Sequence, residues 1–440
     1  MVKRITSLLI CITLYNLYSS QELVLGDYIP GNGMVFSSSD QNYKVVLRGY
    51  TQSLFESKTI SFDDPNIIDD NTYNRFRARR VRLRLSGNQL SPGFSYRLQV
   101  DLAQSVVGDG ELAGLLLDAW IGYNINKKIK IVLGQKATPT DNISLQMASN
   151  SLQLPERSRV TSAFASIREV GIFMEGKFKL GNTSVIKPML NITNGDGHNT
   201  LNNDFGGFKY GARINFLPFG LFRNFGQFRQ VDLVRELNPK LMIGLNTSYN
   251  VGMSSRRGRG NGDILYLNSL GDYSLPNFLK YGADILFKYR GFSLISEFVQ
   301  TKAYVPTDIT QRQRNDGSVS TSFEIDGVQN VENYVRNRMM LGSGFNIQMG
   351  YLLKSLYSLD ARFSNLQSDK YSFMNNSAFY NRNQYYTIGF SKYFMKAYTY
   401  KIQASYTYVN DAMIRDLTSI ESTAYQGNEN ILRLMVQIAF

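Results

Sequence analysis

An arginine-rich stretch carries the clearest chemical signal in this sequence. Arg80, Arg82 and Arg84 alternate with apolar residues. In an extended strand, a two-residue step places such side chains on one face about 7 Å apart. A guanidinium group carries donors that match phosphate and carboxylate oxygens, so this column could bind small anions and pass them along. The alternative is an arginine wall that acidic residues balance, without selectivity.

A second set of arginines in the same stretch has the opposite parity. Arg75, Arg77 and Arg79 would face away from Arg80 in a regular strand. We therefore expect a β-bulge near Ala78, which would bring both sets to one side, unless the stretch rises above a membrane.

Residues 138–165 form the second candidate region. The segment follows Lys136 and contains Glu156, Arg157 and Arg159. If it folds inward as a constriction loop, Arg157 approaches the Arg80 column. The alternative is a loop that only lies over the mouth of the fold.

The elements that position these residues are read from hydrophobic alternation. Strands with one apolar and one charged face, joined by short turns on one side and long polar loops on the other, are typical of an outer-membrane barrel. The fold class we expect is all-β, a transmembrane antiparallel β-barrel of about 16 strands with long extracellular loops and short periplasmic turns. The expected strands are 43–56, 74–87, 94–104, 113–126, 129–137, 166–180, 183–193, 206–216, 239–251, 279–290, 291–302, 333–351, 355–366, 381–394, 396–410 and 428–440.

The charged faces of these strands must point into the barrel. A Lys or Arg that faces lipid at the bilayer midplane costs roughly 2–4 kcal/mol, and several strands carry such residues. We therefore expect a charged, water-filled lumen and an apolar outer face. In 396–410 the outer face would include Tyr398 and Tyr400, opposite Lys401 and Gln403.

One connection on the short-turn side is unusually long. Residues 217–238 carry Phe219, Phe222, Phe225 and Phe228 at intervals of three. They could form an amphipathic element on the inner membrane interface. A loop that packs its own aromatics against the barrel rim is the other interpretation.

The two ends of the chain and its composition agree with secretion to a membrane. Residues 1–20 read as a signal peptide, 21–42 as a periplasmic segment and 43–440 as the barrel. The 28 Tyr and 27 Phe suit aromatic girdles. The net charge of +13 favours anionic partners, namely small anions or the phosphates of lipopolysaccharide and outer-membrane lipid. The secretory signal argues against nucleic acid.

Other motifs predict little chemistry. His198 is the only histidine, so it cannot build a multi-histidine metal site, and no partner motif for a catalytic triad stands out; a solvated loop residue is expected. The acidic residues of the first long loop match no defined calcium loop; they are Asp63, Asp64, Asp69 and Asp70. We expect no enzyme activity, no cofactor and no metal. Arginines among glycines at 256–259 suit contact with lipopolysaccharide phosphates, or only solubility.

At this point the residues carry a family resemblance. The segments NRFRARRVRLRLSG, LLLDAWIGY, IVLGQKATPTDNISLQMASNSLQLPERSRV and REVGIFMEG, within 74–178, resemble the phosphate-selective porin O and P family of Gram-negative outer membranes. The chain also ends on Phe440 after an alternating strand, which resembles the terminal signal read by the barrel assembly machinery. The resemblance implies a sixteen-stranded homotrimer with an arginine ladder and an inward third loop.

The resemblance also implies roles for particular residues. Arg79 and Arg80 match the family's paired arginines, Asp118 matches its lumen aspartate, and Arg157 matches the arginine after the loop glutamate. Leu145 stands where the family has a lysine, and Arg82 where it has a tyrosine. One cation is lost and one is gained, which favours anion preference over tight phosphate binding.

The function that we expect is a passive diffusion channel of the cell outer membrane that prefers small anions such as phosphate. Its anion pathway would comprise Arg79, Arg80, Arg82, Arg84, Asp118, Lys136, Arg157 and Arg159. The alternative is a non-conducting barrel that serves as a structural subunit of a larger outer-membrane complex.

Overall fold

The computed structural model describes residues 23–24, 28–29, 31–62, 71–103, 115–197, 206–259, 264–314, 316–376, 379, 382–415 and 424–440. The expected signal peptide, His198 and the acidic residues Asp63, Asp64, Asp69 and Asp70 lie outside these residues. Among the helices described, none has the length and apolar character that crossing a bilayer would need.

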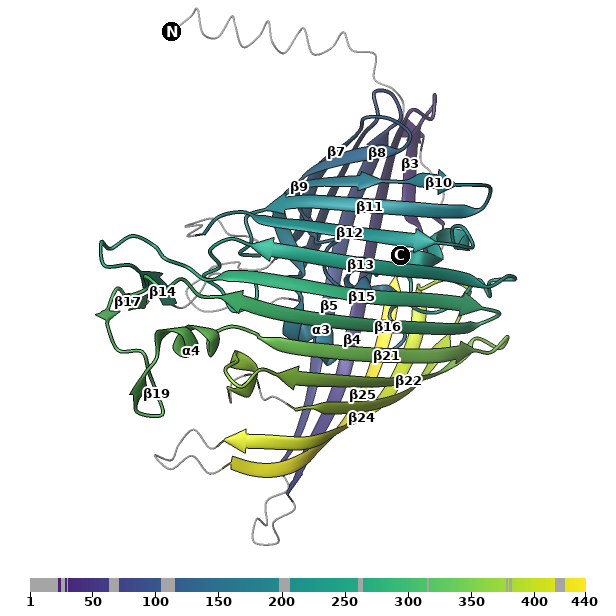
Figure 1. The fold of residues 1–440 in the computed structure, drawn as a ribbon. Coiled ribbons are helices and arrows are strands. Elements are labelled where there is room, and N and C mark those ends of the chain that lie inside the picture. Colours follow the sequence, from purple (N-terminus) through teal and green to yellow (C-terminus); the bar gives the residue numbers. More distant parts are fainter. Residues whose placement is uncertain are drawn as a thin grey trace, which may run out of the picture.

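Within the described residues, sixteen strands form one closed antiparallel barrel, which confirms the expected fold class (Figure 1). The last strand pairs with the first, and this closes the ring. The strands are β4 (Tyr43–Phe62), β5 (Asn71–Gln89), β6 (Phe94–Asp101), β7 (Leu116–Asn124), β8 (Ile129–Ala137), β9 (Arg168–Gly176) with its continuation β10 (Phe178–Leu180), β11 (Ser184–Thr193), β12 (Lys209–Leu217), β13 (Lys240–Asn250), β15 (Asn277–Tyr289), β16 (Phe292–Tyr304), β21 (Gly342–Leu352), β22 (Tyr357–Ser368), β23 (Gln384–Tyr393), β24 (Tyr400–Arg415) and β25 (Ala424–Ala439).

Loop lengths segregate to the two ends as expected. At the short-turn end, β15 and β16 are separated by Arg290 and Gly291 alone, and Gly291 has a φ of 96°, which glycine adopts without a Cβ clash. At the long-loop end, the segments after β13 and β16 build a small structure of their own beyond the strand ends (Figure 1). Its elements are β14 (Ile264–Leu267), β17 (Gln311–Arg314), β18 (Val319–Ser320), β19 (Glu324–Ile325), β20 (Val328–Gln329) and α4 (Val331–Arg336).

Helix α4 replaces the beginning of the strand expected at 333–351, so that part of the prediction was wrong. The Asn330 side chain accepts a hydrogen bond from the Asn333 amide at 2.9 Å and caps the helix. Tyr334 and Val335 then pack into an apolar cluster of the long loops instead of facing lipid. Strand β21 begins only at Gly342.

The bulge expected near Ala78 is present and resolves the two parities of arginine. Gln52 on β4 opposes Arg80, but the next residue, Ser53, opposes Ala78, so Arg79 is the extra residue. Phe76 is 84% exposed on the outer face, between arginines that line the interior. The arginines on both sides of Ala78 therefore share the lumen.

The N-terminal segment continues the barrel seam at the short-turn end. The amide of Phe440 donates to the Gly49 carbonyl at 2.9 Å, and the Gly49 amide donates back at 3.1 Å. Closer to the short-turn end than this pair, β3 (Gly33–Ser38) takes the place of β25 beside β4. The two-residue strands β1 (Leu23–Val24) and β2 (Tyr28–Ile29) pair with β3. The first barrel strand therefore has a partner along its whole length.

Candidate functional site

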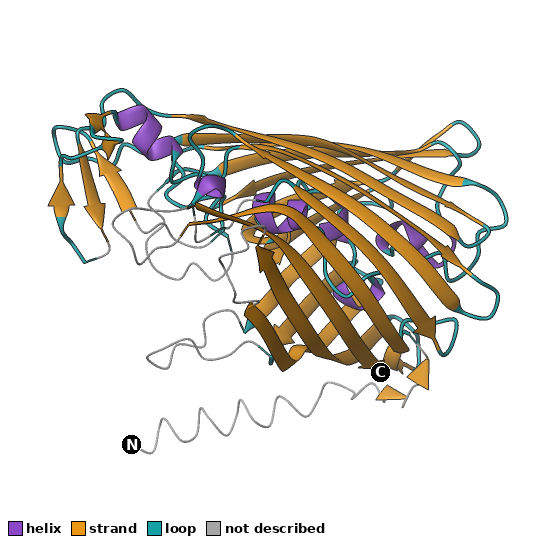
Figure 2. Cartoon of the chain, turned by 90° about the horizontal axis from the view of Figure 1, so that it is seen from below, coloured by secondary structure: helices purple, strands orange, loops and turns teal. Residues whose placement is uncertain are grey.

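The segment 138–165 runs inside the barrel and is tied to walls on several sides. It carries α2 (Ile143–Gln146), η2 (Ser149–Ser151) and α3 (Arg159–Phe164), which appear as helical turns within the ring of strands (Figure 2). Backbone groups of this segment bond to β16, β22 and β24: the Ser144 amide to Glu297 at 2.9 Å, the Glu156 carbonyl to Arg362 at 2.8 Å and the Leu152 carbonyl to Lys401 at 2.8 Å.

The long connection at the short-turn end also enters the barrel instead of lying on the membrane interface, and of its four phenylalanines Phe222 packs against the barrel wall. Gln230 accepts from the Gln153 amide at 2.9 Å and from Gln348 at 3.1 Å, so it bonds the inward segment to the wall. Lys288 donates to three carbonyls of the connection. The connection's helical character is limited to the 3-10 element η3 (Arg223–Phe228), which is kinked at Asn224 and Phe225, whose φ angles of 50° and 56° are left-handed. The polar groups that hold it inside lie between and beyond the phenylalanines, so the interval of three did not indicate its position.

Tyr398 illustrates the same correction. We expected it on the lipid face, but β24 begins at Tyr400 and Tyr398 lies in the preceding turn. Its hydroxyl donates to the Val231 carbonyl at 2.8 Å inside the barrel. Together with Val231, Leu233 and Tyr393 it forms an apolar cluster.

One side of the lumen is therefore dry. Ile143 and Met147 of the inward segment and Phe222 of the connection pack on apolar residues of the inner face of β11 to β16. The expected water-filled interior was wrong for this wall, because two inserted segments supply apolar partners that a bare barrel lacks. The inner-face residues are Val185, Leu217, Met242, Leu286 and Ile295.

The remaining lumen cavity has a volume of about 1160 Å³ and follows the other wall, from β22 through β25 and β4 to β9, and reaches Lys187 and Met189 on β11. Its lining includes Phe440 and Gly31 at the short-turn end and Lys58 and Arg382 at the long-loop end. Among the described residues that line it, twenty are basic and five are acidic. The cavity therefore spans the barrel beside a strongly cationic wall.

All eight residues expected in the anion pathway line this one cavity; they are Arg79, Arg80, Arg82, Arg84, Asp118, Lys136, Arg157 and Arg159. They come from β5, β7, β8 and the inward segment, which the bulge and the inward fold bring together. Leu145, which stands where the family resemblance implies a lysine, also lies in the cavity lining.

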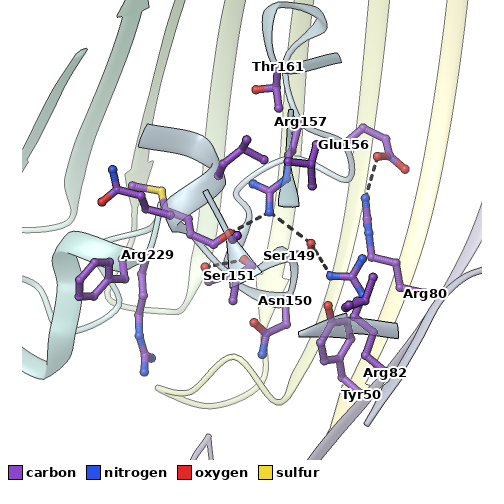
Figure 3. Close-up of a pocket in the computed structure, with 18 of the residues that line it drawn as sticks. Tyr50, Arg80, Arg82, Ser149, Asn150, Ser151, Glu156, Arg157, Thr161 and Arg229 are labelled. Atoms are coloured by element: carbon purple, nitrogen blue, oxygen red, sulfur yellow. Dashed lines mark hydrogen bonds and ion pairs between the residues drawn. The ribbon is translucent and has the colours of Figure 1, made fainter. Parts of the chain in front are cut away.

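Two arginines share one oxygen at the inward segment (Figure 3). The Ser149 hydroxyl accepts from Arg82 Nη1 at 3.1 Å and from Arg157 Nη2 at 3.3 Å. Arg157 also donates to the carbonyls of Ser144 and Met147, so the backbone of the segment fixes its guanidinium. Burial and the nearby charges of Arg80 and Arg82 lower the pKa of Arg157 from its ordinary value. An oxygen between two guanidiniums is the arrangement in which an oxyanion binds.

Glu156 of the same segment neutralises the paired arginines. Its carboxylate accepts from Arg79 Nη2 at 3.0 Å and from Arg80 Nη2 at 2.8 Å (Figure 3 shows the bond to Arg80). Burial alone would raise the pKa of Glu156, but the charges of Arg80 and Arg79 outweigh it and lower the pKa to about 2. The chain's own carboxylate thus occupies donors that an anion would otherwise use.

The other candidate residues differ in how they are balanced. Asp118 bonds Arg168 at 2.9 Å and lies 3.8 Å from Arg97, whereas Lys136 forms an ion pair with Glu175. Three pathway candidates have no carboxylate of this kind, and one of them is Arg157, which donates to Ser144, Met147 and Ser149.

Arg159 and Arg84 are the other two candidates. Arg159 donates to the Phe379 carbonyl at 2.5 Å and stacks 4.3 Å above the Phe379 ring. Arg84 has no hydrogen bond or ion pair to any described residue, and its Nε is buried. Within the described residues, no cluster of side chains suits a metal ion.

The sequence reasoning did not single out several lining cations. Arg97 and Arg433 stand on the polar parity of their strands, so inward-facing charge was a usable signal for them. Arg362 carries the same signal, but Arg168 has the parity of the outward-facing Ile172. Arg229 lies on the long connection, where no alternation indicates direction. The arginines at 256–259 turn inward rather than outward, since Arg257 donates to the Ser162 carbonyl at 2.6 Å and Arg259 lines the cavity.

A family model described as phosphate-selective porin O and P matches residues 59–440 of the chain. No curated protein matches this chain. Solved structures that are similar include the outer membrane channel DcaP of Acinetobacter baumannii, at 14% identity over 92% of this chain and 99% of that one, with a TM-score of 0.49. An anion-selective porin from Comamonas acidovorans aligns at 10% identity over 90% of this chain and 100% of that one, with a TM-score of 0.48.

Proposed function

Because this chain belongs to the phosphate-selective porin O and P family, we propose that its lumen cavity conducts small anions, including inorganic phosphate, across the outer membrane by passive diffusion. The protein is an outer-membrane channel of the porin family. Anion preference is the part that is proposed, and in this proposal the short-turn end faces the periplasm.

The observation that carries the proposal is the charge of the cavity wall. Twenty basic against five acidic lining residues give the cavity a positive potential over its length, as far as the described residues extend. Such a potential raises the local concentration of anions and lowers that of cations. Conduction also needs release, so no single site along the wall should hold an anion too tightly.

We propose a central oxyanion site at Arg82, Ser149 and Arg157. Two guanidiniums replace part of the hydration of an anion, and the serine hydroxyl donates a further hydrogen bond once it turns toward that anion. Glu156 weakens the site because it competes for Arg80, and Asp118 acts in the same way through Arg168 and Arg97. Lys136 and Arg159 extend the cationic wall on either side.

Reversal potentials across planar bilayers test this proposal. With a potassium chloride gradient, the wild-type protein should pass chloride in preference to potassium. Arg157→Ala should move the reversal potential toward zero selectivity. Arg157→Lys should keep most of the chloride preference, because the charge remains, but should weaken block of the chloride current by inorganic phosphate, because the guanidinium fork is lost.

Two results would contradict the proposal. Cation preference in the wild-type protein would rule out the cationic wall as the filter. Absence of any conductance from folded protein would favour the alternative that the barrel is a structural subunit of a larger complex, which the two inserted segments would then seal.

Partners follow from the family and stay proposals. We propose a homotrimer, contact with lipopolysaccharide and outer-membrane lipid on the apolar outer face, and recognition of Phe440 by the barrel assembly machinery. Light scattering in detergent would measure the number of copies.

A further inference from the structure

Three arginines of the first three barrel strands face the cavity at one level near the short-turn end. Arg48 on β4 and Arg84 on β5 are direct partners in the strand register. Arg97 on β6 opposes Ser86, two residues from Arg84 and on the same face. All three line the cavity. Arg84 is four residues from Arg80, which corresponds to roughly 13 Å along a strand.

These three cations lack a closely bound carboxylate among the described residues. Arg48 donates to neutral oxygens of Asn32, at 2.5 Å to the carbonyl and at 3.2 Å to Oδ1. Arg97 approaches only Asp118, at 3.8 Å, and that carboxylate is already bonded to Arg168 at 2.9 Å. The Nε atoms of Arg84 and Arg97 are buried without any partner.

An aromatic residue orders this cluster without neutralising it. Trp120 on β7 opposes Arg97 in the register, and its ring lies 5.1 Å from the Arg97 guanidinium and 4.7 Å from the Lys130 amine. Cation–π contact fixes the direction of a guanidinium but leaves its N–H groups free to donate. The indole N–H of Trp120 is itself buried and has no partner.

Like charges that stand directly opposite in a sheet destabilise it, and buried donors without acceptors add to that cost. An anion between the three guanidiniums removes both penalties at once. We propose that Arg48, Arg84 and Arg97 form a second oxyanion site, which binds a small tetrahedral oxyanion such as inorganic phosphate on the short-turn side of the Arg82–Ser149–Arg157 site. This inference rests on the proposed function, and it adds a separate binding step before the anion leaves the barrel.

Two sites in series make a countable prediction. Equilibrium dialysis of the detergent-purified, full-length protein against radiolabelled inorganic phosphate should give two bound phosphates per chain. Arg84→Gln should leave one, with affinity at the lost site reduced at least about tenfold, the factor expected for a lost charge-assisted hydrogen bond. Arg97→Gln, on a different strand, should give the same result and guards against a folding defect of one variant.

The matched control is Lys128→Gln, which removes the same charge from the exposed turn between β7 and β8 at the same end of the barrel. It should keep both phosphates. Two bound phosphates in both Arg84→Gln and Arg97→Gln, or a single phosphate in the wild-type protein that both variants retain, would overturn the second site. Neither result would affect the proposed function, which instead depends on the chloride preference of the wild-type channel.

Discussion

The two ends of the lumen cavity treat their cations in opposite ways. At the long-loop end, Glu56 accepts from Arg75 at 2.5 Å and from Arg433 at 2.6 Å. At the short-turn end, Arg84 has no such partner among the described residues and stands opposite Arg48. One end is a partly neutralised network, in which three arginines share Glu56, and the other keeps its positive charge available.

This difference indicates that the arginines of the cavity wall do not contribute equally to selectivity. A guanidinium that is bonded to a carboxylate contributes little net potential to an ion at a distance, because the two charges nearly cancel. On β5, Arg75 and Arg77 share Glu56, and Arg79 and Arg80 share Glu156. Arg84 has no carboxylate partner among the described residues. We therefore expect the short-turn end to dominate anion preference and the long-loop end to dominate stability.

The largest effect should come from removal of an acid of the neutralised network. Glu156→Leu leaves Arg80 buried without its carboxylate, and breaking a buried pair in this way costs about 3–5 kcal/mol of unfolding free energy. Denaturant titration in detergent would measure it. The control is Glu324→Leu on the exposed hairpin β19–β20, which should change stability by less than about 0.5 kcal/mol. Equal losses of unfolding free energy in Glu156→Leu and Glu324→Leu would show that the buried Glu156 stabilises the fold no more than an exposed glutamate does.

Acid should reduce the contribution of Glu156 in a defined window. Its pKa in the folded protein is lowered to about 2, and an unfolded glutamate has a pKa near 4.3. The stabilisation is therefore complete above about pH 4.3 and is lost as the pH falls toward 2. The stability difference between wild type and Glu156→Leu should be the same at pH 7 and pH 5 and smaller at pH 3. A difference that shrinks already between pH 7 and pH 5 contradicts the lowered pKa.

The contrast between the two ends also shows which features of the structure can be predicted from the sequence. The strands and the bulge at Arg79 were predictable, because lipid and water impose opposite demands on alternate residues and Arg75 and Arg80 could not both be satisfied by a regular strand. The partners of the arginines were not predictable. Glu56 and Arg433 are 377 residues apart in the chain and meet only because the barrel closes.

The inward fold of 138–165 was among the predictions, whereas the inward position of the connection 217–238 was not, for a different reason. Alternation has meaning only where one face meets lipid, and the connection that carries Gln230 and Val231 meets none. Its position depends on hydrogen bonds from Gln153, Lys288 and Tyr398, which lie on other elements. The unpaired state of Arg84 was hidden likewise, since it depends on which acids fail to reach it.

A moderate effect, the stabilisation of the folded protein by bound phosphate, should distinguish the two ends of the cavity. At a phosphate concentration ten times the dissociation constant, one site stabilises the folded protein by about 1.4 kcal/mol. Thermal unfolding of the wild-type protein in phosphate should therefore occur at a higher temperature than in sodium chloride of equal ionic strength. Part of this shift should vanish in Arg84→Gln and remain in Lys128→Gln. A full shift in Arg84→Gln would place all phosphate binding elsewhere.

The smallest effect has the opposite sign and tests the contrast most directly. Arg84→Leu, without added phosphate, should raise the free energy of unfolding by about 0.2–1 kcal/mol. The substitution removes a positive charge that stands directly opposite Arg48 on the neighbouring strand. The same exchange at Arg80, whose guanidinium is bonded to Glu156, should lower stability instead. Denaturant titration of the two variants side by side gives the comparison. Since both substitutions remove one arginine of β5 from the cavity wall, a loss of stability in both would mean that Arg84 is balanced after all, and the distinction between the two ends would fail.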